Sequence, residues 1–426
     1  MINSRKKKPI RPFLSNNPAF EGIRRLRNPD LFDHDDYSQI QQKYFADLRE
    51  HGGADADPSG WLQTYSSSGA LFVFPALTSD DIGPYYIDEG DALGEHKEAI
   101  SRLLSKWDGS PIAPEHFTLC PSGGTASLIT LAALKEHGVK RILFETPSYF
   151  GTVEQANQLE IDYDLIPTYR RDGYALPDMR SRLHSDDPIA IWLTHPRASL
   201  GINQSREYIE QLLERMTPQH YLVVDEVTDQ TFPAHLGALH ANFPSANLVR
   251  IRSFLKGMGY NGVRLSAILH TARLRGSLVD AVESLGGSLD AHSLFAVKLL
   301  ANDIPRFRAM LRAANEQVND LRRKAEEIVR GSLVSINPLV NGYIGSTVVD
   351  LKMLGETQRE RRTRLLEACR SLRTPVSLGA SFYLAKDPPT EAIRLNFLTH
   401  PDQLLRGIAN IVRAVEGPVL SSGSTS

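Results

Sequence analysis

Lys256 stands in a segment whose residue types could form a covalent bond to an aldehyde. It lies in the run Ser253-Phe-Leu-Lys-Gly-Met-Gly-Tyr-Asn-Gly-Val-Arg264, among glycines and between a serine and an arginine. A lysine amine condenses with an aldehyde to a Schiff base, and a nearby hydroxyl and guanidinium can bind a phosphate. The segment therefore predicts a site for a phosphorylated aldehyde cofactor. The alternative is a surface turn with a solvated lysine, because glycine-rich turns often carry lysine.

Two further segments carry groups that such a cofactor needs. In Ser122-Gly123-Gly124-Thr125, small residues before a helical stretch expose backbone N–H groups to a phosphate; a plain helix N-cap is the alternative. Asp225 ends an apolar run, so its carboxylate needs a partner such as a protonated pyridine nitrogen or a metal. No histidine or carboxylate cluster with ligand spacing surrounds it, and we predict no metal site.

Two more residues stand out by their place in apolar surroundings. Tyr149 follows an apolar run, where an aromatic side chain can stack on a flat ring, although such residues more often belong to the core. Arg394 interrupts the apolar run Ile393-Arg-Leu-Asn-Phe397. A buried arginine binds a carboxylate, which is supplied either by an amino-acid substrate or by a structural salt bridge.

These residues fall near the ends of short apolar runs that alternate with helical stretches. The runs occupy residues 117–119, 141–144, 163–166, 189–193, 221–224, 248–251 and 265–269. Such alternation indicates an α/β architecture with a mainly parallel sheet flanked by helices, which binds ligands at its strand ends. We predict a large cofactor-binding domain over residues 81–300 and a connecting helix over 301–330. A smaller α+β domain comprises residues 331–426 and part of an N-terminal arm over 1–80.

Composition excludes several classes of function. The chain has 426 residues, 41% hydrophobic and 23% charged, with a net charge of −2. These values are typical of a globular protein and give no reason to expect nucleic acid as a partner. No apolar stretch is long enough to span a membrane, and the basic run at residues 5–8 is not followed by an apolar segment of a signal peptide. Two distant cysteines, Cys120 and Cys369, fit a reduced cytoplasmic setting.

From about residue 85 to residue 415, the chain resembles the fold-type I pyridoxal-5′-phosphate (PLP) enzymes, specifically the class I/II aminotransferases. The likeness rests on the order of a Gly-Gly-Thr turn, Pro-Ser-Tyr, His-Pro-Arg-Ala-Ser-Leu-Gly, Asp-Glu-Val, Ser-x-x-Lys with a later Arg, and an Arg in a late strand. It implies PLP as the cofactor, an amino acid and a 2-oxo acid as substrates, and a homodimer with the active site between subunits.

The resemblance also implies a role for each matched residue. Lys256 forms the Schiff base and moves protons, and Asp225 keeps the pyridine nitrogen protonated. The remaining roles are phosphate binding by Gly124, Thr125, Ser253 and Arg264, ring stacking by Tyr149, α-carboxylate binding by Arg394, and a phosphate contact across the dimer interface by Tyr86, with Tyr85 as its rival.

The chain departs from the family pattern where the cofactor's phenolic oxygen is expected. Ala198 stands in place of an asparagine and Thr228 in place of a tyrosine, both of which would donate a hydrogen bond to that oxygen. Losing a donor should leave the imine at Lys256 more basic. We therefore expect it to stay protonated to higher pH than in ordinary aminotransferases, unless His195 or a water fills the gap.

Four functions remain open on the sequence alone, and one of them is a nucleotide-binding α/β enzyme in which these motifs occur by coincidence. An aminotransferase is the first, and a non-transaminating PLP enzyme of specialised biosynthesis is the second, acting by elimination, cyclisation, decarboxylation or oxidative deamination. A PLP-sensing regulator is remote, because no helix-turn-helix and no basic excess precede the matched region. For the substrate side chain, Arg197, Arg252 and Tyr260 are near enough in sequence to be considered, and Arg197 fits a turn residue better.

Overall fold

The computed structural model describes residues 56–58, 91–179, 183, 187–258, 260, 262–286, 289–350, 355, 357–378 and 390–417. Its core is a sheet of seven strands in the order β1-β7-β6-β5-β4-β2-β3, in which β7 alone runs against its neighbours. This confirms the predicted mainly parallel α/β sheet. The strands are β1 (Phe117–Cys120), β2 (Arg141–Thr146), β3 (Asp162–Pro167), β4 (Ile189–Thr194), β5 (Tyr221–Asp225), β6 (Leu248–Ser253) and β7 (Ser266–Leu269).

Helices cover both faces of this sheet, because successive residues of a strand point to opposite sides. Ile142 and Phe144 pack with α5 (Gly123–Glu136), α6 (Phe150–Gln158) and α9 (Arg275–Ala281), which lie on one face. Leu143 packs on the other face with α7 (Arg206–Arg215) and α8 (Leu239–Asn242). β4 and β5 are buried on both faces, so they hold the loops that follow them in fixed positions at the carboxyl edge of the sheet.

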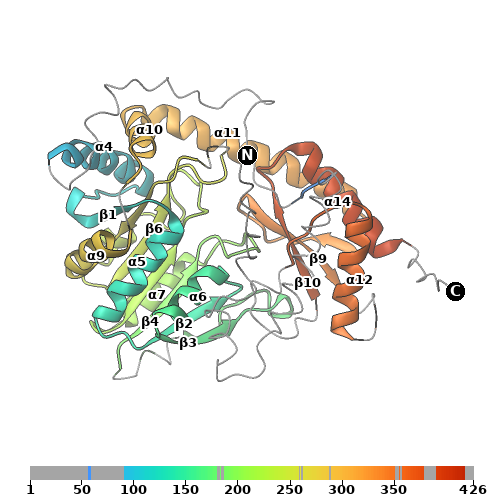
Figure 1. Cartoon of the computed structure of the whole chain (residues 1–426), viewed down its shortest axis with the longest axis horizontal. Coiled ribbons are helices and arrows are strands. Elements are labelled where there is room, and N and C mark those ends of the chain that lie inside the picture. The colour runs from blue at the N-terminus through green and yellow to red at the C-terminus, as the bar shows by residue number, and fades with distance from the viewer. Residues whose placement is uncertain are drawn as a thin grey trace, which may run out of the picture.

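A second, smaller sheet lies beside the first and is joined to it by two helices (Figure 1). It is antiparallel, in the order β10-β9-β8. Asp303 separates α10 from α11 and caps α11 by accepting a hydrogen bond from Arg306 N at 3.2 Å. The elements are α4 (Asp91–Asp108), α10 (Ala291–Asn302), α11 (Ile304–Val329), β8 (Val334–Ile336), β9 (Ile344–Asp350), α12 (Gln358–Ser371), β10 (Thr390–Asn396) and α14 (Pro401–Glu416).

The loop after β4 meets the small sheet at Gly201. Gly201 has a φ of +67°, and a Cβ there would lie 1.8 Å from the carbonyl oxygen of Ile344. Its own carbonyl accepts hydrogen bonds from Asn341 N at 2.7 Å and Gly342 N at 3.0 Å. Only glycine fits this approach, which brings the first residue of β9 to the carboxyl edge of the large sheet.

The short described N-terminal segment packs on the small module. Asp57 N donates to Gln403 Oε1 at 2.9 Å, and Pro58 O accepts from Asn396 N at 2.9 Å. These contacts are in keeping with an N-terminal contribution to the small domain, although the domain boundaries stay a prediction. Among the described helices, none is long and apolar enough to cross a membrane.

Candidate active site

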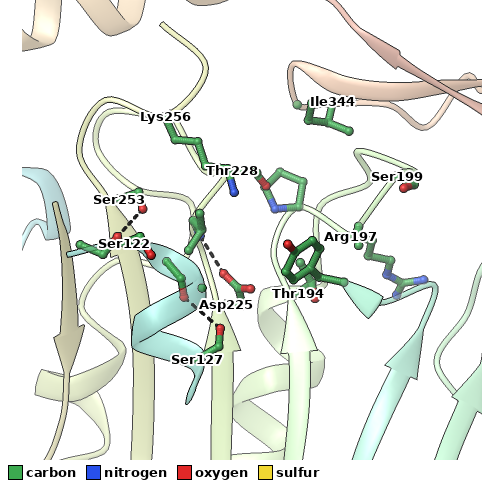
Figure 2. Close-up of a pocket in the computed structure, with 18 of the residues that line it drawn as sticks. Ser122, Ser127, Thr194, Arg197, Ser199, Asp225, Thr228, Ser253, Lys256 and Ile344 are labelled. Carbon is green, nitrogen blue, oxygen red and sulfur yellow. Dashed lines mark hydrogen bonds between the residues drawn. The ribbon is translucent and has the colours of Figure 1, made fainter. Parts of the chain in front are cut away.

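A cavity of about 730 Å³ opens at the carboxyl ends of the strands, where the large and small sheets meet (Figure 2). Most of the residues singled out in the sequence line it together: Gly124, Tyr149, Asp225, Thr228, Ser253, Lys256, Arg264 and Arg394. Thr125 does not, and Tyr85 and Tyr86 lie outside the described residues. The fold therefore gathers side chains from positions 124 to 394 into one space.

Lys256 follows β6 in a turn that glycine makes possible. Gly257 has a φ of +82°, and a Cβ there would lie 2.8 Å from the ring of Tyr343. The carbonyl of Lys256 is fixed by a hydrogen bond from the Gln230 side chain. Burial lowers the pKa of the Lys256 amine; Asp225 opposes this shift, and Arg394 and Arg264 add to it. A lowered pKa leaves more of the amine unprotonated and nucleophilic near neutral pH.

Asp225 ends β5 and presents its carboxylate to the same cavity. It is 7% exposed and accepts a hydrogen bond from Val227 N at 3.1 Å. Burial raises its pKa, and the charge of Lys256 only partly opposes that shift. A cationic N–H group placed in the cavity would therefore be bound strongly by this carboxylate.

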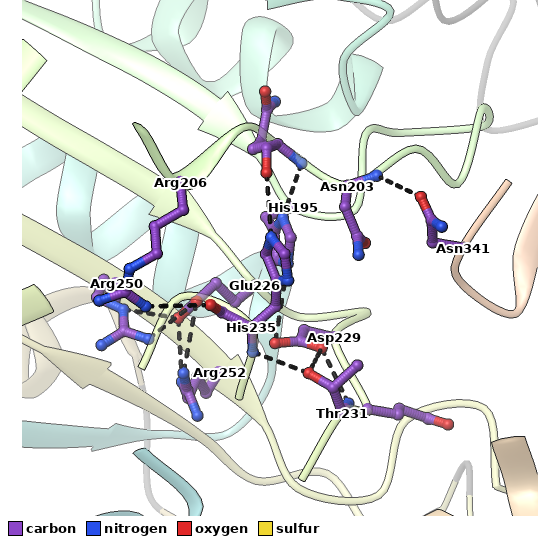
Figure 3. Close-up of polar contacts among 12 residues, drawn as sticks. His195, Asn203, Arg206, Glu226, Asp229, Thr231, His235, Arg250, Arg252 and Asn341 are labelled. Atoms are coloured by element: carbon purple, nitrogen blue, oxygen red, sulfur yellow. Dashed lines mark hydrogen bonds and ion pairs between the residues drawn. The ribbon is translucent and has the colours of Figure 1, made fainter. Parts of the chain in front are cut away.

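The next residue, Glu226, anchors the turn after β5 in a buried ionic cluster (Figure 3). Arg250 contacts Glu226 at 2.9 Å and Asp108 at 2.7 Å, and Arg252 contacts them at 3.0 Å and 3.2 Å. Burial raises the pKa of both acids, but the two arginines overcome it and hold the pKa of Asp108 at about 2. The two arginines neutralise the charges of the two acids. Their contacts hold Glu226 in place, and with it the backbone of its neighbour Asp225.

Hydroxyl and backbone groups gather at the start of α5. Ser122 caps this helix by accepting a hydrogen bond from Thr125 N at 3.1 Å, and its hydroxyl also contacts the Thr125 hydroxyl at 2.9 Å. Ser253 Oγ lies 2.6 Å from Ser266 Oγ. Arg264, two residues before Ser266 in the chain, also lines the cavity. A helix N-terminus with two hydroxyls and a guanidinium suits a phosphate.

Close packing leaves no room for a larger residue at the helix start. A Cβ on Gly123 would lie 2.8 Å from Val227 Cγ2 and 3.5 Å from Ser253 Oγ. This contact ties α5 to the turn that follows Asp225.

Sequence reasoning missed Ser266 and Thr194, which also line the cavity. Only the pairing of Ser266 with Ser253 across β7 and β6 reveals the first of them.

Two aromatic residues and an arginine also line the cavity. Tyr149 and Phe150 are 44% and 41% exposed, with ring centroids 5.1 Å apart. Gly151 makes room for the Tyr149 ring, since a Cβ there would lie 2.7 Å from Tyr149 Cε1. Arg394 enters from β10, opposite Ser346 of β9, and burial lowers its pKa. The guanidinium of Arg394 could thus hold a carboxylate in the cavity.

The loop after β4 supplies small residues to the cavity wall. Ala198 lines the cavity, as does Thr228 from the turn after β5. His195 does not: it is fully buried, accepts a hydrogen bond from Gln204 N at 3.1 Å and stacks on His235 with centroids 5.1 Å apart. His195 is therefore not placed to fill the gap left by Ala198.

Arg197 also lines the cavity, but its guanidinium points away from Lys256 (Figure 2). Its Nε lies 2.8 Å from Glu145 Oε1, its Nη2 donates to Gln204 Oε1 at 3.2 Å, and its Nη1 donates to the carbonyl of Tyr174. Arg197 is thus a buried structural residue, in line with its sequence interpretation. Arg252 belongs to the ionic cluster, and Tyr260 does not line the cavity.

Three buried histidines predict loss of stability in mild acid. Burial lowers the pKa of His195 and of His270 to about 4 and that of His240 to about 3. The unfolded chain binds these protons near pH 6.5, so the free energy of unfolding should fall as pH drops from there towards 4. His195 alone would account for at most about 3 kcal/mol, because one pKa unit corresponds to about 1.4 kcal/mol.

Urea unfolding of wild type and of His195→Asn at several pH values between 7 and 4 measures this effect. The variant should show a shallower loss of stability with falling pH. An identical pH dependence in the two proteins would show that His195 does not contribute.

Comparison with known proteins identifies the family. The sequence model of the class I and II aminotransferases matches residues 89–409, most of the chain. The chain belongs to this family. The family and the transferase function predicted from the sequence are thereby confirmed. Curated proteins gave no match.

Solved structures show the same fold at low sequence identity. A double mutant of the aspartate aminotransferase from Thermus thermophilus is 14% identical, with a TM-score of 0.71 over 92% of this chain and 98% of that one. YbdL from Escherichia coli, identified with a methionine aminotransferase function, is 14% identical, with a TM-score of 0.69 over 94% and 100%. The aromatic aminotransferase from Pyrococcus horikoshii is 16% identical, with a TM-score of 0.64 over 88% and 91%. These matches confirm the aminotransferase fold.

Proposed function

We propose that the cavity binds pyridoxal 5′-phosphate and transfers the α-amino group of an amino acid to a 2-oxo acid. The bound cofactor would supply an aldehyde to receive the amino group and a pyridine ring to absorb electrons from the substrate. The residues fit it: a buried amine, a buried carboxylate and a cluster of phosphate-binding groups share one cavity. The amine of Lys256, with its pKa lowered by burial, carries this proposal.

Each residue that was singled out has a role in this proposal. Lys256 Nζ would hold the cofactor covalently until the substrate amine displaces it, and the freed amine would then move a proton from the substrate Cα to the cofactor carbon. Asp225 keeps a proton on the pyridine nitrogen, and its raised pKa makes that cationic partner favourable. Gly124, Thr125, Ser253 and Arg264 bind the phosphate, Tyr149 stacks on the ring, Thr228 donates to the phenolic oxygen, and Arg394 binds the substrate α-carboxylate.

Two further parts of the proposal are the number of subunits and the cellular location of the protein. We propose a homodimer in which Tyr86 reaches the partner's phosphate, with Tyr85 as its rival. Membership of the class I and II aminotransferase family supports a second subunit. Cys120 and Cys369 are both free and buried, which supports the predicted reduced cytoplasmic setting.

A half-reaction tests the function. Holoenzyme mixed with an amino acid and no acceptor should give one equivalent of the 2-oxo acid per active site, with the nitrogen retained on the cofactor. Mass analysis of both products measures this balance. Release of ammonia, of carbon dioxide or of a cyclised product instead would favour the non-transaminating alternative.

The contacts of Arg197 predict that this residue does not bind a substrate side chain. Its guanidinium is held by Glu145 at 2.8 Å and by Gln204 at 3.2 Å, so it is not available to a substrate carboxylate. We therefore expect Arg197→Lys to change kcat/KM for glutamate and for glutamine by the same factor. A loss confined to glutamate would contradict this expectation.

The small residues near the phenolic oxygen predict an unusual pH titration of the visible cofactor band. Ala198 offers no donor there and Thr228 offers only a short hydroxyl. The proton at Lys256 Nζ should therefore stay bound to above neutral pH, and Thr228→Val should move the midpoint further up. Spectra recorded between pH 5 and 10 measure both midpoints. A wild-type midpoint at or below neutrality would rule out this reading of the two residues.

A further inference from the structure

The large sheet holds the chain before Lys256 only as far as the end of β6. Ser253, the last residue of β6, pairs with Ser266 of β7. Residues 254–258 then form bends and turns, and Lys256 lies in the middle of them. The place of the Lys256 amine therefore depends on the contacts that this turn makes outside the sheet.

Gln230 makes such a contact with the backbone of Lys256. Its side-chain Nε2 donates a hydrogen bond to the carbonyl oxygen of Lys256, and the Gln230 residue is 8% exposed. On the next residue, a Cβ at Gly257 would lie 2.8 Å from the ring of Tyr343. The turn is thus held by a buried hydrogen bond and by close packing, and the hydrogen bond acts on the residue that carries the amine.

The turn that carries Gln230 is itself well held. Asp229 N donates to Glu226 O at 3.0 Å, and Thr231 N donates to Asp229 Oδ1 at 2.9 Å. Asn315 of α11 reaches the same turn, where its Nδ2 donates to Gln230 O at 3.2 Å. The Gln230 side chain therefore extends from a fixed backbone and can hold another segment in place.

We propose that Gln230 is a positioning residue, which holds Lys256 where its amine reaches the cofactor aldehyde and then the substrate Cα. This inference rests on the proposed function. Gln230 is not among the residues that line the cavity, so it acts through Lys256. Reacting atoms must approach to about 3 Å, and a displacement of about 1 Å can slow a reaction about 100-fold. The hydrogen bond joins the turn after Asp225 to the turn of Lys256, so it fixes one relative to the other.

The first reaction of the amine provides a direct test. Lys256 Nζ adds to the aldehyde carbon, and the aldehyde oxygen leaves as water with the two amine protons. Gln230→Met keeps the length of the side chain but removes the donor. After apoenzyme is mixed with pyridoxal 5′-phosphate, the visible band should develop about 10- to 100-fold more slowly in this variant than in wild type. A wild-type rate would overturn the proposal.

Asn315→Leu provides a second variant in case Gln230→Met does not fold. It leaves the Gln230 side chain in place and removes the donor to the Gln230 backbone. The covalent bond to Lys256 should form about fivefold more slowly, the usual effect of losing one neutral hydrogen bond. If Gln230→Met is unfolded, a wild-type rate in Asn315→Leu overturns the proposal instead.

Pyridoxamine 5′-phosphate separates an effect on Lys256 from an effect on the cavity. It has an amine in place of the aldehyde and forms no bond to the lysine. The dissociation constant of its complex with apoenzyme should therefore change by less than about threefold in Gln230→Met. If this affinity falls by the same factor as the rate of bond formation, Gln230 supports the cavity as a whole and the proposal is wrong.

A substrate deuterated at Cα extends the test to the holoenzyme. In Gln230→Met, kcat should fall about 10- to 100-fold, while KM changes by less than about threefold. The deuterium isotope effect on kcat should be at least as large as in wild type, because transfer of the Cα proton to a displaced Lys256 amine limits the rate. A loss that appears in KM alone would contradict a role through Lys256.

Asn247→Leu is the matched control at the opposite end of β6. Asn247 is 6% exposed, and its Nδ2 donates to the carbonyls of Pro218 at 2.7 Å and His220 at 3.1 Å. This variant also loses a buried amide that binds backbone carbonyls, so its melting temperature should fall. The rate of bond formation to Lys256 should stay within about threefold of wild type. Equal slowing in Asn247→Leu and Gln230→Met would overturn the proposal.

Reductive labelling of Lys256 in the same preparations keeps the two tests apart. Labelled wild type together with a wild-type rate in Gln230→Met defeats this inference and leaves the proposed function standing. Wild type that is saturated with cofactor and carries no label on Lys256 defeats both.

Discussion

Lys256→Ala is expected to lower the rate of amino-group transfer by at least about 10⁴-fold, because one side chain supplies both the covalent attachment and the proton transfer. The amine projects into the cavity beside Asp225, and burial lowers its pKa. Alanine keeps neither function. Single-turnover conversion of an amino acid to its 2-oxo acid measures the loss.

Two controls show whether the loss at Lys256 is chemical. Lys256→Arg keeps the positive charge but not a nucleophilic amine, and it should be as inactive as the alanine variant. Added ethylamine should partly restore proton transfer in Lys256→Ala, because a small amine fits the space that the side chain leaves. A melting temperature close to that of wild type would exclude unfolding. Activity above about 1% of wild type in either variant would contradict a catalytic role.

Asp225→Asn is expected to reduce the same rate by about 100- to 1000-fold, the usual effect of removing one fixed electrostatic partner of a developing charge. The amide has nearly the shape of the carboxylate but no charge to hold a proton on a ring nitrogen. Burial raises the pKa of Asp225, and among the described residues Lys256 and Val227 N oppose that shift. The cofactor's affinity should fall together with the rate.

Asp229→Asn is the matched control. Asp229 is also buried, at 2% exposure, and lies in the same turn, but it does not line the cavity. The same chemical change there should alter the rate by no more than a few fold. Comparable losses at both positions would indicate a disturbed turn and not a charge acting on the cofactor.

The layered sheet was predictable because its strands are buried on both faces. Runs such as 189–193 and 221–224 are apolar without alternation, and both became strands of the parallel sheet. The start of the connecting helix near Pro305 was predictable as well, since proline is favoured in the first turn of a helix. The antiparallel direction of β7 left no local signal, because strand direction depends on pairing with β6 and β1.

The site was predictable only where residue type limits the chemistry. A lysine placed between a serine and an arginine and an acid at the end of a buried strand each indicate a definite chemistry, so Lys256 and Asp225 were singled out, and both line the cavity. A hydroxyl group does not limit the chemistry in this way, and Ser266 is an ordinary serine in the sequence. Its place in the cavity wall became apparent only from its cross-strand pairing with Ser253.

Borohydride reduction tests the central claim most directly. Protein saturated with pyridoxal 5′-phosphate is reduced, digested and analysed by peptide mass spectrometry. The account predicts one cofactor-derived mass increment per chain, on the peptide that contains Lys256, and none in Lys256→Ala. An increment on a different lysine, or unmodified Lys256 in fully saturated protein, would contradict it.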